Sequence, residues 1–83
     1  MQVKKPQTVA QAAAIKDYID QHKMHTYPKE LRIKIRRCVL NAELVKDDKV
    51  ELIREIQVNG VIVGSGKDVR YVSYRSLENY EVK

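Results

Sequence analysis

The sequence has little that could cross-link it covalently and no long apolar run. Its single cysteine, Cys38, has no partner within the chain, so a disulfide scaffold is excluded and a reduced, cytoplasmic setting is expected. The longest apolar stretches, 12–15 and 61–63, are far shorter than the roughly 20 residues that a membrane-spanning helix needs. We therefore expect no membrane partner.

Internal repeats and low-complexity segments are absent, and 83 residues leave room for one small domain. A chain of this length buries only about 60% of the surface that it exposes when unfolded, so its core is thin. The composition, 43% hydrophobic and 33% charged, is typical of a globular protein. A large multi-substrate enzyme is excluded.

Charge is distributed unevenly along the chain. Residues 1–40 carry nine basic and three acidic side chains, a net charge of +6, whereas residues 41–83 carry seven basic and eight acidic side chains, a net charge of −1. The basic residues are densest between Lys29 and Arg37. Such a patch attracts polyanions, although a solvated helix face can have the same composition.

The first half of the chain has the periodicity of helices. From Val9 onward, apolar residues recur at helical spacing after the capping residue Thr8, which predicts a helix over about 9–23. A second helix is predicted over about 29–40, with Pro28 near its start, where a missing N–H costs nothing.

The second half predicts a third helix followed by a hairpin. Asp47 or Asp48 would cap a helix over about 48–58, since acids suit its positive end. Its buried stripe would be Val50, Ile53 and Ile56, and Asn59-Gly60 would end it. Residues 42–46 are then a connector between helices.

Two β-branched and aromatic segments, 61–64 and 69–74, flank a glycine-containing loop at 65–68 and predict a β-hairpin. A short turn is predicted at 77–80, and a loose tail after it. The predicted organisation is a flexible basic arm at 1–7, one domain at 8–75, and a C-terminal turn and tail at 76–83.

Residues 48–74 resemble a winged helix-turn-helix domain, and are similar to small phage-type winged-helix proteins. The layout of a helix, an Asn-Gly stop, an apolar strand, a Gly/Ser/basic tip and a strand with an aromatic residue carries the resemblance. It implies an α+β fold, a three-helix winged helix-turn-helix with a C-terminal β-hairpin wing. It also implies that the third helix reads DNA bases and the wing contacts phosphates.

The candidate DNA-binding residues follow from this resemblance and from the charge pattern. We expect base contacts from the third helix and phosphate contacts from the second helix and the hairpin. The candidates are Lys29, Arg32, Arg36, Arg37, Lys49, Arg54, Gln57, Lys67 and Arg70.

Motifs for catalysis or metal binding are incomplete, so no enzyme, cofactor or metal is expected. The segment 64–67 lacks the spacing of a phosphate-binding loop. His22 and His25 have no third ligand nearby in the sequence. Cys38 lies on the apolar stripe of the second predicted helix, which favours a core residue over a nucleophile.

The leading hypothesis is a sequence-specific protein that binds double-stranded DNA, acting in a phage or mobile element. It would be either a transcriptional regulator, as a homodimer on a palindrome, or an excisionase-like accessory factor. The alternative is a protein-interaction module that binds a host protein and inhibits or modulates it, because Glu51 and Glu55 interrupt the basic face of the third predicted helix.

Overall fold

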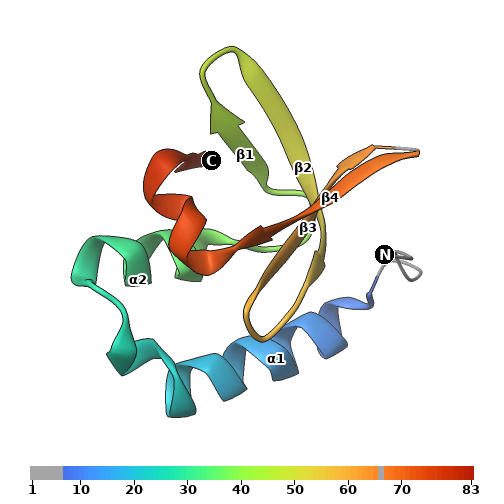
Figure 1. Ribbon diagram of the computed structural model, residues 1–83. Helices are drawn as coiled ribbons and strands as arrows, with labels where there is room; N and C mark the ends of the chain where they lie inside the picture. The colour runs from blue at the N-terminus through green and yellow to red at the C-terminus, as the bar shows by residue number, and fades with distance from the viewer. Residues whose placement is uncertain (1–6, 66) are drawn as a thin grey trace.

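The computed structural model describes residues 7–65 and 67–83, which form an α+β arrangement of two N-terminal helices followed by an antiparallel sheet (Figure 1). The elements in chain order are α1 (Val9–His22), η1 (Met24–Thr26), α2 (Lys29–Arg37), β1 (Glu43–Lys46), β2 (Lys49–Ile56), β3 (Gly60–Ser65), β4 (Asp68–Ser73), η2 (Tyr74–Asn79) and β5 (Glu81–Val82), where η marks a 3-10 helix.

The two predicted N-terminal helices are confirmed. Helix α1 begins with a capping box, in which the Thr8 hydroxyl accepts a hydrogen bond from the Gln11 backbone and the Gln11 side chain accepts one from Thr8. Helix α2 follows Pro28 and ends at Arg37, three residues earlier than predicted. Neither α1 nor α2 is long and apolar enough to cross a membrane, and the same holds for the other helices among the described residues.

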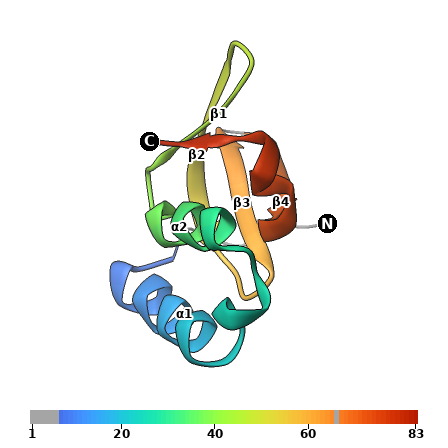
Figure 2. The same ribbon diagram turned by 90° about the vertical axis from the view of Figure 1, so that its left-hand side faces the viewer.

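The five strands of the described residues lie in the order β4-β3-β2-β1-β5, and all pairs are antiparallel. Strand β2 is the longest and belongs to both halves of the sheet, since it pairs with β1 near its start and with β3 near its end. The β1–β2 hairpin extends away from the helices in both views (Figures 1 and 2). Its tip is therefore free of the helical layer.

The predicted third helix is wrong, because residues 49–56 form strand β2. A β-bulge between Ile53 and Glu55 explains the error. Ile53 pairs with Val63 and Ile56 pairs with Val61, so three residue steps along β2 match two along β3. Ile53 and Ile56 therefore share the core face at a spacing that a helix would also give.

The segments around this strand also differ from the prediction. Asp47 and Asp48, expected to cap a helix, form the tight turn between β1 and β2, with Asp47 at φ 54°. Residues 57–59 connect β2 to β3, which begins at Gly60, so Asn59-Gly60 does not end a helix. Residues 43–46 of the predicted connector form β1, and the tail predicted to be loose contains β5, which pairs with β1.

The predicted C-terminal hairpin is confirmed as β3 and β4. Its core contacts come from Val61, Val63 and Val72, whereas Tyr71 lies on the opposite face and is exposed. The final aromatic of the predicted strand, Tyr74, belongs to η2 and is fully buried.

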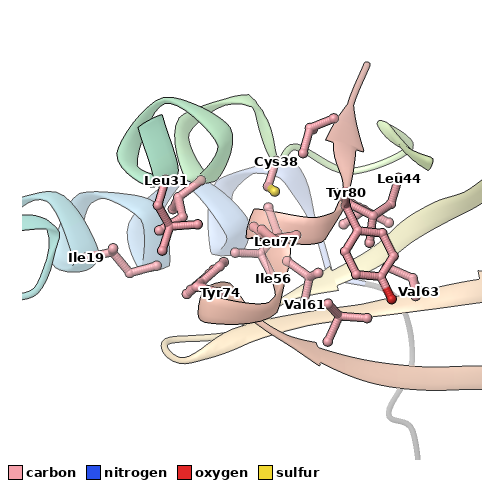
Figure 3. Close-up of a cluster of buried hydrophobic side chains, with 14 of the residues drawn as sticks. Ile19, Leu31, Cys38, Leu44, Ile56, Val61, Val63, Tyr74, Leu77 and Tyr80 are labelled. Atoms are coloured by element: carbon pink, nitrogen blue, oxygen red, sulfur yellow. The ribbon is translucent and has the colours of Figure 1, made fainter. Parts of the chain in front are cut away.

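The core lies between the helices and one face of the sheet. Figure 3 shows Ile19 and Leu31 from α1 and α2 beside Ile56 of β2, with Leu77 and Tyr74 of η2 among them. The Tyr74 hydroxyl donates to the Gln57 carbonyl oxygen at 2.6 Å, which satisfies its polar end. Cys38 is also fully buried in this cluster, as predicted.

Gly64 and Asn41, which both have a positive φ, test how much backbone strain a side chain adds at each position. Gly64 has φ +121°, and a Cβ atom there would lie 2.0 Å from the Asp68 carbonyl oxygen. We expect Gly64→Ala to lower the free energy of unfolding by about 1–3 kcal/mol in urea denaturation. Asn41→Gly, at φ 71°, should change it by less than about 0.5 kcal/mol, because glycine accepts this conformation. An equal decrease in the free energy of unfolding of the two variants would contradict the strain expected for alanine at position 64.

Candidate nucleic-acid interface

The nine predicted DNA-binding residues divide between two parts of the molecule. Lys29, Arg32, Arg36 and Arg37 lie on α2, and the other five lie on the sheet or its turns. Figure 1 places α2 and the β3–β4 turn, which carries Lys67, on opposite sides of the molecule. The nine residues therefore do not form one continuous surface.

Helix α2 presents a basic face to solvent. Its buried side is formed by Leu31 and Ile35, while Lys29, Arg36 and Arg37 are exposed and Arg32 is half-buried. Glu30 is the only acidic residue of this helix. Arg36 also meets Asp20 of α1 at 3.6 Å, and both side chains of this ion pair are at least half exposed, so the pair contributes little to stability.

The C-terminal carbonyls of α2 are satisfied from another helix. The Lys16 ammonium of α1 donates to the Ile35 carbonyl oxygen, and to the Cys38 carbonyl oxygen at 2.9 Å. Burial lowers the pKa of Lys16, although nearby Cys38 and Asp20 oppose that shift. Because Lys16 serves these carbonyls, the arginines of the last turn are not needed there and can project into solvent.

The sheet residues of the predicted set include two that are occupied within the chain. Arg70 of β4 forms an ion pair with Glu51 of β2 at 2.5 Å and donates to the Tyr80 hydroxyl at 3.0 Å. These two hydrogen bonds raise the pKa of Arg70. Gln57 donates to the Glu55 carboxylate at 2.8 Å.

The remaining sheet residues lie apart from one another. Lys49 begins β2 at the tip of the projecting hairpin, Arg54 lies at the bulge, and Lys67 lies in the β3–β4 turn. Since residues 49–56 form a strand, Lys49, Arg54 and Gln57 do not share a helical face that could enter the major groove. The predicted reading of bases by such a helix is therefore wrong.

Two lysines that shape the charged surfaces were not predicted from the sequence. Lys16 caps α2, and Lys46 lies over the Tyr80 ring, 5.3 Å from its centroid. The signal for Lys46 was the segment 46–49, two lysines around two aspartates, which fits a tight hairpin turn. Interpreting these aspartates as helix caps hid that signal.

The described residues contain no group of three or more side chains that could hold a metal ion. Of the two histidines considered as ligands, His22 packs its ring on Tyr18, with 4.6 Å between the ring centroids.

Comparisons with protein-family models, with curated proteins and with solved structures find no match for this chain. The surfaces of the molecule itself are therefore the basis on which a function can be proposed.

Lys16 provides a test of how α2 is held. Replacing it with methionine keeps most of the apolar stem but leaves the Cys38 carbonyl without this donor, and the Ile35 carbonyl with only the Cys38 N–H. We expect Lys16→Met to lower the free energy of unfolding by about 1–3 kcal/mol. The exposed Lys29→Met should stay within about 0.5 kcal/mol of the parent protein. Similar urea midpoints for both variants would show that Lys16 does not support the helix end.

Proposed function

We propose that the protein is a cytoplasmic protein that binds double-stranded DNA, and that the solvent face of α2 supplies its main phosphate contacts. The observation that carries this proposal is the α2 face of Lys29, Arg32, Arg36 and Arg37, where the helix has one acid, Glu30, and the only ion pair of these side chains among the described residues is the exposed one between Arg36 and Asp20. Basic side chains on one exposed face form the electrostatic footprint of a nucleic-acid binder.

The alternative explanation for this face is a solvated helix whose last cations interact favourably with its C-terminus. Lys16 weakens that explanation, because it already bonds to the carbonyls at this end. Free guanidinium groups bind phosphate oxygens through two parallel N–H donors, which suits arginine more than lysine. Three of the four basic residues on the face are arginines, and this supports phosphate as the ligand.

We propose only one part of the winged-helix mode of DNA binding, the hairpin wing, without a recognition helix. The β3–β4 hairpin keeps the position along the chain that the resemblance gives to a wing, but β2 replaces the recognition helix before it. Contacts to the DNA backbone, rather than base reading by a third helix, then provide the affinity. Within this proposal the protein is a transcriptional regulator or an excisionase-like accessory factor, and footprints on a promoter or an attachment site separate the two.

The proposal predicts salt-dependent DNA binding that depends on α2. Fluorescence anisotropy with a labelled duplex at several salt concentrations gives the slope of log K against log salt. In Arg36→Gln/Arg37→Gln the slope should become shallower by about 0.9 for each phosphate that is no longer neutralised.

Arg75→Gln/Lys83→Gln removes the same charge from exposed sites that lie outside α2 and outside the predicted DNA-binding set. It is the matched control, with a slope expected to match that of the parent. An equal change in both variants would mean that only net charge matters. No binding by the parent protein at low salt would overturn the proposed function.

A second candidate function, protein binding, has support from an apolar surface on the projecting hairpin. Val50 and Leu52 of β2 are 56% and 37% exposed, and Val45 lies directly opposite Val50. Exposed apolar side chains grouped on one face commonly mark a contact with another protein.

If this face binds a host protein, Val50→Ser/Leu52→Ser should abolish capture of a single stoichiometric partner while leaving the DNA salt slope unchanged. Retention of that partner by the variant would remove the hairpin face as its binding site.

A further inference from the structure

A hollow lies beside the projecting hairpin, away from the solvent face of α2. The ends of β1 and β2, Arg70 of β4, and Tyr80 after η2 surround it, and its volume is about 590 Å³, which is the size of a small-molecule site. It is lined by Lys46, Asp47, Asp48, Lys49, Glu51, Arg70 and Tyr80.

The hairpin register places two cations together at this hollow. Lys46 and Lys49 pair directly across the strands, so their side chains project from the same face of the hairpin. Like charges in this position repel each other and destabilise the hairpin. Among the described residues, no ion pair joins either lysine to an acid.

Of the described acids that line the hollow, Glu51 is the one that lies on a strand, and it is already engaged. Its carboxylate accepts from both Nε and Nη2 of Arg70, with the closest contact at 2.5 Å. Asp47 and Asp48 lie in the turn, where both are exposed. Lys46 and Lys49, which are also exposed, flank this turn and have no ion-pair partner among the described residues, whereas Glu51 is neutralised by Arg70.

The aromatic wall of the hollow supplies a further donor. Lys46 and Arg70 both lie over the Tyr80 ring, with the ammonium 5.3 Å and the guanidinium carbon 5.7 Å from its centroid. Its hydroxyl accepts a hydrogen bond from Arg70 Nη2. A tyrosine hydroxyl can also donate one hydrogen bond, and no acceptor for it is found among the described residues.

Several hydrogen-bond donors at the hollow thus have no acceptor among the described residues. The two ammonium groups, the Tyr80 hydroxyl and the remaining Nη1 of Arg70 come to one site from four segments of the chain: β1, β2, β4 and the residue after η2. A phosphate monoester has three terminal oxygens and close to two negative charges at neutral pH, so it matches several donors better than a two-oxygen carboxylate does. The aspartates of the turn disfavour a long polyanion that crosses the turn, and favour a compact anion beside the two lysines.

We propose that this hollow is a binding site for a phosphate monoester, with Lys46, Lys49 and the Tyr80 hydroxyl as its ligands and Arg70 as the group that orients Tyr80. The group can come from a free nucleotide or from the 5′ end of a nucleic acid, and the chemistry at the site is the same. This site goes beyond the proposed contact of α2 with the DNA backbone, because it uses other residues and a different kind of phosphate.

The experiment is an NMR titration of the full chain, at constant ionic strength, with inorganic phosphate, a nucleoside 5′-monophosphate and the nucleoside alone. We expect saturable amide shifts confined to the β1–β2 turn, Arg70 and Tyr80 with the first two ligands and none with the nucleoside. A short single strand with and without a 5′-phosphate then distinguishes the two sources of the group.

Lys46→Gln/Lys49→Gln should weaken the affinity for phosphate at least about tenfold, because two charge-assisted hydrogen bonds are removed. Lys67→Gln/Lys83→Gln carries the same charge change elsewhere and should bind phosphate as the parent does. Tyr80→Phe keeps the ring but removes the hydroxyl, and should weaken binding several-fold.

Unsaturable shifts spread over the surface, or equal losses of affinity in both double-lysine variants, would overturn the site. These readouts do not depend on duplex binding, so the site and the proposed DNA function can fail separately. If Arg36→Gln/Arg37→Gln loses DNA affinity while phosphate still shifts the hairpin, both stand as separate surfaces.

Discussion

The β-bulge in β2 is the constraint on which the rest of this structure depends. It adds one residue between the pairs Ile53–Val63 and Ile56–Val61, so both isoleucines reach the core from one strand. A regular strand would instead direct Glu55 into the apolar cluster in place of Ile56, whereas here Glu55, although only 6% exposed, receives a hydrogen bond from Gln57. The bulge also increases local twist, which allows β2 to pair with β1 at one end and with β3 at the other.

The division of β2 sets the position of both charged surfaces. Its first half continues beyond the core as part of the projecting hairpin, where only one face is covered and Lys49 reaches the tip. Its second half lies against the helices, and the Gln7 side chain there bonds to both the N–H and the C=O of Ile56. The start of α1 is thereby fixed beside the sheet, and Lys16, further along that helix, can reach the end of α2.

Much of the local structure could be predicted from the sequence, and the failures have a common physical origin. The helices at 9–22 and 29–37 and the β3–β4 hairpin have strong local signals: a cap, a proline and a glycine-containing turn. Strand β2 lacks such a signal, because its bulge gives buried residues the spacing of a helix. Its partners β1 and β5 depend on pairing between segments distant in sequence, and local propensity does not report such pairing. The two charged surfaces also differ in whether a local sequence signal or strand pairing determines them. The α2 cations were evident from composition, whereas the opposition of Lys46 and Lys49 appears only once the register is known.

The net charge of +5 therefore describes two different kinds of surface rather than one basic patch. On α2, cations project into solvent from a helix that contains one acid, a geometry that suits many exchangeable contacts along a polyanion. At the β1–β2 hairpin, equal numbers of acids and bases line a concave site, so its selectivity for an anion must come from position rather than from total charge. The Arg70–Glu51 pair produces that selectivity, because it neutralises the inner acid and holds the Tyr80 hydroxyl in place. A local site of this kind is invisible in the charge count of its segment, which is why the nearly neutral second half of the chain can contain it.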